Sequence, residues 1–289
     1  MPFYFLSLLR EKRPCGMIGA YEEREETAML EQIAPRIWRM NDRNRATIYL
    51  VVGKEKAYAI DSGNGLDPLM PELRAVTGLP IELLVTHAHP DHVGSANEFD
   101  TVWLFREEYE HLDELERRVT LMDRVLHIDR DRIRVFDADA IFDAGDVSLR
   151  VVPLRGHTPG SVVFVDDADR AAFMGDAIGS GNISLISLPC TYDIPAYRAS
   201  LERFTREAAD IEGYTWHGGH YHQAGVPGTP GYNPLRMDIV RDMIRLCDAL
   251  CARTITGQYI APGIACHDAC LEAHLGCAGL IYYPEQIPD

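Results

Sequence analysis

The amino-acid sequence predicts an α/β fold in which β-sheets pack together beneath layers of helices. Short apolar runs rich in β-branched and aromatic residues, bounded by turn residues, recur along the chain and indicate strands. Helical segments are inserted between groups of these strands. No short-period repeat or low-complexity segment interrupts this order. The pattern favours packed sheets whose connecting loops present the ligand-type side chains.

The chain has 289 residues, 46% of them hydrophobic and 25% charged, which suits one large domain or two small ones. Residues 1–28 hold a short apolar patch and the polar run "YEEREET", and periodic structure begins near Met29. We therefore predict an N-terminal extension over residues 1–28 and one domain over residues 29–289. The alternative is that translation starts upstream of a domain that really begins near Met29, which would explain the same pattern.

The predicted strands flank turns or precede ligand-bearing loops. They are residues 47–52, 56–60, 81–85, 101–105, 133–136, 147–152, 161–165 and 171–174. Four helices complete the prediction. A short one spans residues 68–76, and apolar residues at steps of three and four indicate two more, at 112–126 and 196–211. Asn233 and Pro234 predict the N-cap and first turn of a last helix.

The formal net charge is −16, from 28 basic against 44 acidic residues. A field of this sign repels polyanions, so we expect no nucleic-acid partner. No segment is long and apolar enough to span a bilayer, and the N-terminal apolar run lacks the preceding basic residues of a signal peptide, so we expect no membrane partner. The seven cysteines, an odd number, favour a reducing cytoplasm.

The segment "HAHPDH" places three histidines and an aspartate within residues 87–92, directly after a predicted strand. Imidazole nitrogens and carboxylate oxygens are zinc ligands. His87 and His89 can point to one side of an extended segment, whereas Asp91 and His92 follow around the turn and can face a second point. One loop can therefore serve two metals. A polar turn with solvated or capping histidines is the alternative, disfavoured by four such side chains in six residues.

Three further ligand-type residues lie in glycine-bearing loops after predicted strands. His157 stands in "RGHTPGS", Asp176 in "FMGDAIGSG" and His220 in "WHGGHYH". Glycine lets the backbone approach closely in such loops, and the preceding strands anchor the ligands. A closed structural zinc site is disfavoured, because such sites are usually rich in cysteine and the "HAHPDH" cluster has none.

These motifs resemble those of the metallo-β-lactamase-fold hydrolase superfamily. The similarity includes "DSG" at Asp61, "THAHPDH", Gly-His-Thr-Pro-Gly at residues 156–160, Gly-Asp at 175–176 and Gly-His at 219–220. It runs in order from about Met29 to the C-terminus. The resemblance implies a four-layer αββα sandwich with a dinuclear metal site at one edge, but it says little about the substrate.

The resemblance also implies a role for each motif residue. The first metal would be held by His87, His89 and His157. The second would be held by Asp91, His92 and His220, with Asp176 bridging both. Asp61 would accept hydrogen bonds that orient the ligands and the nearby backbone.

The implied activity is that of a dinuclear-zinc hydrolase, in which a metal-bridging hydroxide cleaves a small carboxylic ester, thioester or lactone and Asp91 accepts the proton. His89 stands where diiron flavoprotein relatives typically carry glutamate, which favours two Zn²⁺ per chain, although iron or manganese could bind. The alternatives are a phosphodiester or phosphonate hydrolase and a non-catalytic metal-binding or redox module.

Departures from the better-known branches narrow this interpretation. True metallo-β-lactamases do not usually carry the bridging aspartate that Asp176 supplies. Glyoxalase II-like thioesterases tend to have basic and tyrosine residues soon after that aspartate, and lactonases have a tyrosine where this chain has Gly179. The chain therefore resembles a glyoxalase II-like or lactonase-like branch and is not expected to be a true β-lactamase.

Other residues are weaker candidates. Predicted substrate contacts are His217, His222 and His267. A further structural zinc site is an alternative for Cys266, His267, Cys270, His274 and Cys277. The favoured interpretation of these cysteines is that they are small buried residues on a helix near the pocket. The expected partner is a small-molecule substrate, and a homodimer is common among similar proteins.

Overall fold

The computed structural model describes residues 30–42, 46–118, 127–179, 183–220, 235–262 and 268–288, so the predicted extension over residues 1–28 lies outside it. The first part of the chain forms a seven-stranded sheet in sequence order. Its strands are antiparallel from the first to the fourth and parallel thereafter. They are β1 Glu31–Ala34, β2 Ile37–Asp42, β3 Ala46–Val52, β4 Ala57–Ile60, β5 Ile81–Leu84, β6 Val102–Phe105 and β7 Ile133–Phe136.

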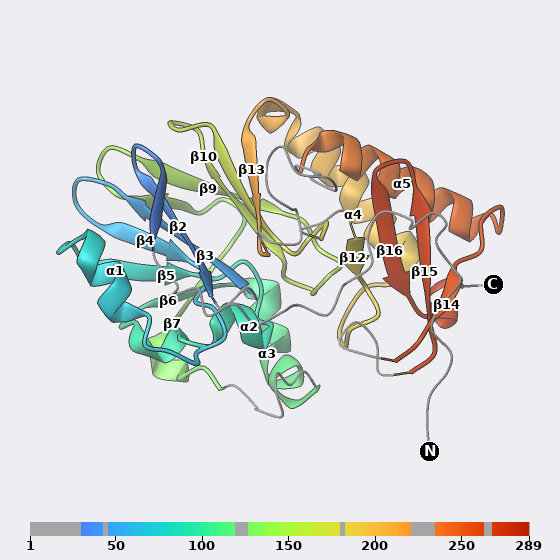
Figure 1. The fold of residues 1–289 in the computed structure, drawn as a ribbon, viewed down its shortest axis with the longest axis horizontal. Helices are drawn as coiled ribbons and strands as arrows, with labels where there is room; N and C mark the ends of the chain where they lie inside the picture. The colour runs from blue at the N-terminus through green and yellow to red at the C-terminus, as the bar shows by residue number, and fades with distance from the viewer. Residues whose placement is uncertain are drawn as a thin grey trace, which may run out of the picture.

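Parallel neighbours need crossover connections, and these supply the helices on one face of the sheet (Figure 1). They are α1 Met70–Val76, α2 Pro90–Val93 and α3 Arg106–Arg118. Helix α3 buries Leu112 and Leu115, as their spacing predicts, and it buries Glu108 on the same side. The predicted continuation of this helix, residues 119–126, lies outside the described residues.

A second sheet of five strands packs face to face against the first. In chain order its strands are β8 Ile141–Asp143, β9 Ser148–Pro153, β10 Val162–Asp166, β11 Ala171–Gly175 and β13 Thr215–Gly218. Aromatic rings fill the interface, with Tyr49 lying 5.1 Å from Phe173 and Phe136 lying 5.1 Å from Phe142 between ring centroids. Burying each of these side chains contributes about 1.5–3 kcal/mol.

Two helices cover the outer face of the second sheet, α4 Ile194–Glu207 and α5 Met237–Cys251. Helix α4 and a 3-10 turn at Ala209–Ile211 together cover the predicted helix of residues 196–211. The predicted start of the last helix at Asn233 and Pro234 lies outside the described residues. The layers are therefore helix, sheet, sheet and helix, which confirms the predicted αββα sandwich. None of the described helices is both long and apolar enough to cross a bilayer.

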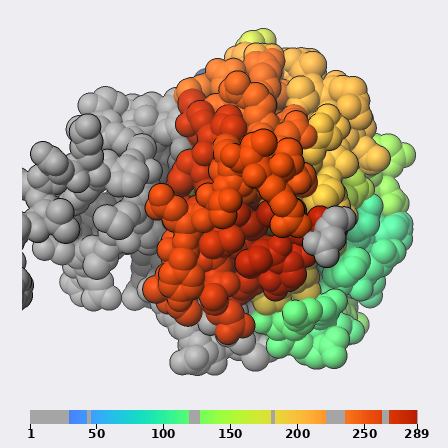
Figure 2. Space-filling view, turned by 90° about the vertical axis from the view of Figure 1, so that its right-hand side faces the viewer, coloured from blue at the N-terminus to red at the C-terminus, as the bar shows by residue number. Residues whose placement is uncertain are grey.

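A third sheet, which was not predicted, packs against α5, and the segment from α5 to the end of this sheet forms much of one side of the molecule, in orange and red in Figure 2. Its strands are β12 Ile183–Leu185, β14 Gln258–Ile260, β15 Cys270–Leu275 and β16 Ala278–Tyr282. The expectation of a helix around Cys270 was wrong. Gly276, with φ of 59°, turns the chain back, so that β15 and β16 pair as a hairpin.

This hairpin also changes the interpretation of the cysteines. Cys270 and His274 stand on one strand, four residues apart and hence about 13 Å along it, rather than one helical turn apart. Cys270 is disulfide-bonded, so its sulfur is not available as a zinc ligand. Cys266 and His267 lie outside the described residues.

Candidate metal centre

The loops at one edge of the two main sheets bring the predicted ligands together. His87 and His89 follow β5, Asp91 and His92 lie in α2, His157 lies between β9 and β10, Asp176 follows β11, and His220 follows β13. Strands β11 and β13 are parallel neighbours, and the Gly219 amide donates to the Gly175 carbonyl at 2.9 Å. Asp176 and His220 consequently leave the sheet at the same edge.

His87, His89 and His157 form a first group. Their ring centroids lie 4.6–4.9 Å apart, and one ligand atom from each lies within 4.8 Å of the others. Two of these rings are held in orientation at Nδ1. His157 Nδ1 lies 2.8 Å from the Leu185 carbonyl, and His87 Nδ1 lies 3.0 Å from the Thr86 hydroxyl. A ring held at Nδ1 presents Nε2 as the ligand atom.

Asp91, His92 and His220 form a second group. Asp91 Oδ2 lies 3.4 Å from His220 Nε2 and 3.8 Å from His92 Nε2. One oxygen of Asp176 faces both groups: its Oδ2 is 3.0 Å from His220 Nε2, 3.6 Å from His92 Nε2 and 3.9 Å from His157 Nε2. This carboxylate is therefore placed to contact cations in both groups.

Asp61 lies behind the ligands. Its Oδ2 is 2.8 Å from His92 Nδ1 and accepts from the Thr86 hydroxyl, and its Oδ1 accepts from the Thr86 amide, both at 2.8 Å. Asp61 also belongs to a third candidate group with His87 and His92. Because both of its oxygens already hold the ligand-bearing segment, we interpret Asp61 as a residue that orients His92 and the backbone before His87.

The electrostatics differ between the two groups. Burial lowers the pKa of His87, His89 and His157 below the ordinary histidine value, so these rings are in the neutral form that binds metals. Burial also opposes charge on His92 and His220, but the neighbouring carboxylates prevail and raise the pKa of both rings. Burial likewise opposes the charge on Asp176, yet His220 and His92 hold its pKa well below the ordinary range.

The site fits a pair of metal ions by its own chemistry. The Nε2 atoms of His87, His89, His92 and His157 are buried and have no hydrogen-bond partner among the described residues. Each buried polar atom left in this state costs about 1–3 kcal/mol. A cation would satisfy these atoms, and imidazole with carboxylate is a donor set that suits zinc.

Metal removal is therefore expected to destabilise the fold. Zinc at about 1,000 times its dissociation constant adds about 4 kcal/mol, or about 8 °C in Tm at about 2 °C per kcal/mol. Calorimetry of chelator-treated protein with and without added zinc measures this difference. Identical melting curves would show that the unpartnered imidazoles do not bind the ion.

The predicted substrate contacts lie apart from these groups or outside the description. His217 stands on β13 with its ring stacked on Phe173, 5.4 Å away, and 5.2 Å from the ring of Tyr49. Burial lowers its pKa to about 4. The structure thus places His217 against aromatic rings at the sheet interface rather than among the ligands. His222 and His267 lie outside the described residues.

Two buried residues beside the ligand loops were missed by the sequence analysis. Tyr197 of α4 packs on Gly156 and donates its hydroxyl to the carbonyl of Ala177, the residue after Asp176, at 2.7 Å. Glu108 of α3 is buried against the loops that contain His89 and His157. The signal for Glu108 was its position four residues before Leu112, on the apolar face of its helix.

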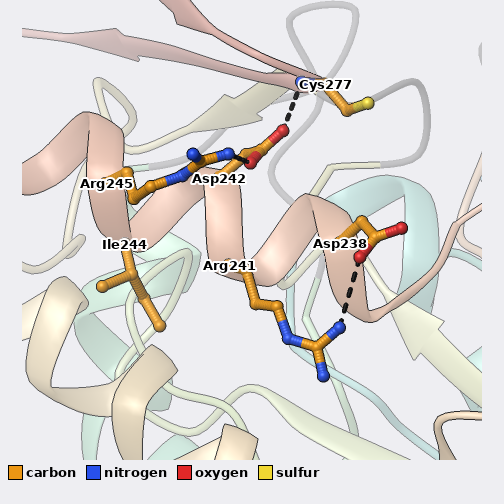
Figure 3. Close-up of a pocket in the computed structure, with 6 residues that line it drawn as sticks. All are labelled: Asp238, Arg241, Asp242, Ile244, Arg245 and Cys277. Atoms are coloured by element: carbon orange, nitrogen blue, oxygen red, sulfur yellow. Dashed lines mark hydrogen bonds and ion pairs between the residues drawn. The ribbon is translucent and has the colours of Figure 1, made fainter.

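An open pocket that none of these ligands lines lies on α5 (Figure 3). Its lining residues are Asp238, Arg241, Asp242, Ile244, Arg245 and Cys277. Arg241 pairs with Asp238 and Glu212, and Arg245 pairs with Asp242. Asp242 also accepts from the Cys277 amide at 2.6 Å and so holds the β15–β16 turn. These contacts give the pocket residues a structural role.

The layered sheets, with groups of histidine and aspartate side chains at one edge that could hold metal ions, define an αββα protein with a candidate metal centre. The model of the metallo-beta-lactamase superfamily matches residues 41–215, more than half of the chain, and the chain belongs to this superfamily. Among solved structures, it is similar to a metallo-beta-lactamase from Pontibacter korlensis, with a TM-score of 0.55, 16% identity and coverage of 77% of this chain and 99% of that one. At this identity the likeness concerns the fold.

Curated relatives include hydrolases. The acyl-coenzyme A thioesterase MBLAC2 of Homo sapiens is 31% identical over an alignment of 170 positions that covers 48% of this chain and 61% of that protein. A hydroxyacylglutathione hydrolase of Francisella tularensis subsp. tularensis (strain WY96-3418) is 26% identical over 181 residues, or 62% of this chain and 66% of that protein. The chain thus spans about three fifths to two thirds of the length of these relatives.

Proposed function

We propose that the protein is a dinuclear-zinc hydrolase that cleaves a small carboxylic ester, thioester or lactone. The observation that supports this most directly is the position of Asp176 Oδ2, within 3.9 Å of imidazole nitrogens from both ligand groups. Two bound metals would lower the pKa of water from about 16 towards 7 and polarise the scissile carbonyl.

The residues have separate tasks in this proposal. His87, His89 and His157 would hold one ion, and Asp91, His92 and His220 the other, with Asp176 shared. The Asp91 side chain is 22% exposed, more than that of Asp176 at 13% or Asp61 at 3%. Asp91 is therefore the carboxylate that water and substrate reach, and we assign to it the orientation of the water and the acceptance of its proton.

The substrate class is supported by the relatives. One is named a thioesterase and another a hydroxyacylglutathione hydrolase, which favours attack on an acyl carbon over attack on phosphorus.

The cysteines bear on the compartment, which we propose to be the cytoplasm. Among the described residues, four free thiols fit a reducing compartment: Cys190, Cys247, Cys251 and Cys277. The disulfide of Cys270 fits an oxidising one. Alkylation of thiols in fresh extracts distinguishes the two.

The test combines metal analysis with a substrate panel. We expect purified protein to hold two zinc ions per chain and to turn over at least one ester, thioester or lactone, with activity lost on chelation and restored by zinc. A phosphodiester and a phosphonate serve as comparison substrates. Protein that binds two metals and hydrolyses none of the acyl substrates would contradict the proposed activity.

A further inference from the structure

Glu108 is a fully buried acidic residue between the two loops that supply the first ligand group. It lies on α3 and is 0% exposed. Its Oε1 accepts a hydrogen bond from the Ala88 amide at 2.6 Å. Its Oε2 accepts from the Thr158 hydroxyl and from the Gly160 amide, both at 2.8 Å.

These three donors belong to the segments that contain the ligands. Ala88 stands between His87 and His89, while Thr158 and Gly160 follow His157 in the next ligand loop. The two amides can only donate, so both carboxylate oxygens must accept. One side chain therefore links the backbone that supplies all three imidazoles of the first group, although these come from loops about 70 residues apart in the chain.

The contact between α3 and the loop that follows His157 is also closely packed. A Cβ added at Gly160 would lie 2.2 Å from the Glu108 amide nitrogen, so only glycine lets this loop approach α3 so closely. Ser161 completes the connection, because its hydroxyl accepts from the Thr158 amide at 3.1 Å and lies 2.8 Å from the Thr158 hydroxyl. The loop has little freedom to move independently of Glu108.

We propose that Glu108 is a positioning residue for the metal centre: its carboxylate fixes the separation between the His87–His89 segment and His157. This inference rests on the part of the proposed function that has the centre bind metal. It does not depend on which substrate is hydrolysed. Burying a carboxylate away from water is costly unless hydrogen bonds compensate, and here the compensating donors all lie in the two segments that carry the ligands. Outer partners of this kind typically contribute about 10–100-fold in metal affinity.

The test compares Glu108→Gln with Glu110→Gln, an exposed position on the same helix. Glutamine keeps the volume but replaces one acceptor oxygen with a donor that faces an amide or hydroxyl. Metal-free protein is titrated with Co²⁺, whose visible absorption reports ligand geometry, and Zn²⁺ affinity is measured by competition. We expect Glu108→Gln to alter the Co²⁺ spectrum and to weaken Zn²⁺ binding about 10–100-fold, with Glu110→Gln unchanged.

Unchanged spectrum and affinity in Glu108→Gln would overturn the inference. A wild-type protein that binds Co²⁺ but hydrolyses no substrate would overturn only the proposed activity, since the variant would still be compared by its spectrum. A wild-type protein that binds no metal would overturn both. Should Glu108→Gln not fold, Thr158→Val removes one donor with little change in shape, and the same shift in spectrum, smaller in size, is expected.

Discussion

Asp91→Asn is expected to lower kcat by about 10²–10⁴-fold, the range that a positioned general base contributes. Asparagine keeps an oxygen near His220 and His92, so most of the metal should stay bound while the proton acceptor is lost. Asp91 Oδ2 lies 3.4 Å from His220 Nε2, which places it inside the second ligand group. Steady-state kinetics with metal analysis of the same preparation measures both effects.

The matched control for this change is Asp100→Asn. Asp100 lies just before β6 with a fully exposed side chain, 3.5 Å from Arg132, and has no contact with the ligands among the described residues. Its variant should keep wild-type kcat. Equal kcat values for wild type and Asp91→Asn would remove Asp91 from the proposed chemistry.

Asp176→Ala is expected to have the largest effect on metal content. Its Oδ2 is the described carboxylate oxygen that approaches both ligand groups, and its charge offsets those of His92 and His220. Residues that only hydrogen-bond to metal ligands contribute about 10–100-fold in metal affinity. Loss of a side chain that binds both metals directly should therefore weaken binding by at least about 100-fold. Zinc per chain should fall below two, and hydrolysis should fall with it.

Plasma emission spectrometry after dialysis measures the zinc content of this variant. Asp210→Ala, which removes an exposed carboxylate paired with Arg150, serves as the control and should keep full metal content. Two zinc ions retained by Asp176→Ala would show that the groups bind metals independently. The bridging role would then be lost, while the separate sites would stand.

The ligand set could be proposed from sequence because most of it is local. Four of its residues occupy one turn after an apolar strand, and the others follow strands in glycine-bearing loops. Most of the strands in the two sheets are short but strongly apolar, so β3–β7, β9–β11 and α4 were also predictable, whereas β1, β2, β8 and β13 were not predicted. Figure 1 shows how the strand ends bring these loops to one region of the molecule.

Features that depend on non-local pairing were not predictable in the same way. Strand β13 is only four residues long and depends on parallel pairing with β11. This pairing places His217 opposite Phe173, so the His217 ring stacks on the Phe173 ring instead of reaching the ligands. The β15–β16 hairpin depends on Gly276 and on burial against α5. The position of Glu108 on the apolar face of α3 was visible in the sequence, but its hydrogen bonds to two distant loops were not.

Anomalous diffraction at the zinc absorption edge, from crystals grown with zinc, tests the central claim most directly. We expect two peaks per chain, one bounded by the Nε2 atoms of His87, His89 and His157, and one beside Asp91, His92 and His220. Asp176 should contact both. A chain with a single peak, or with zinc bound only away from these groups, would contradict the assignment of a dinuclear centre.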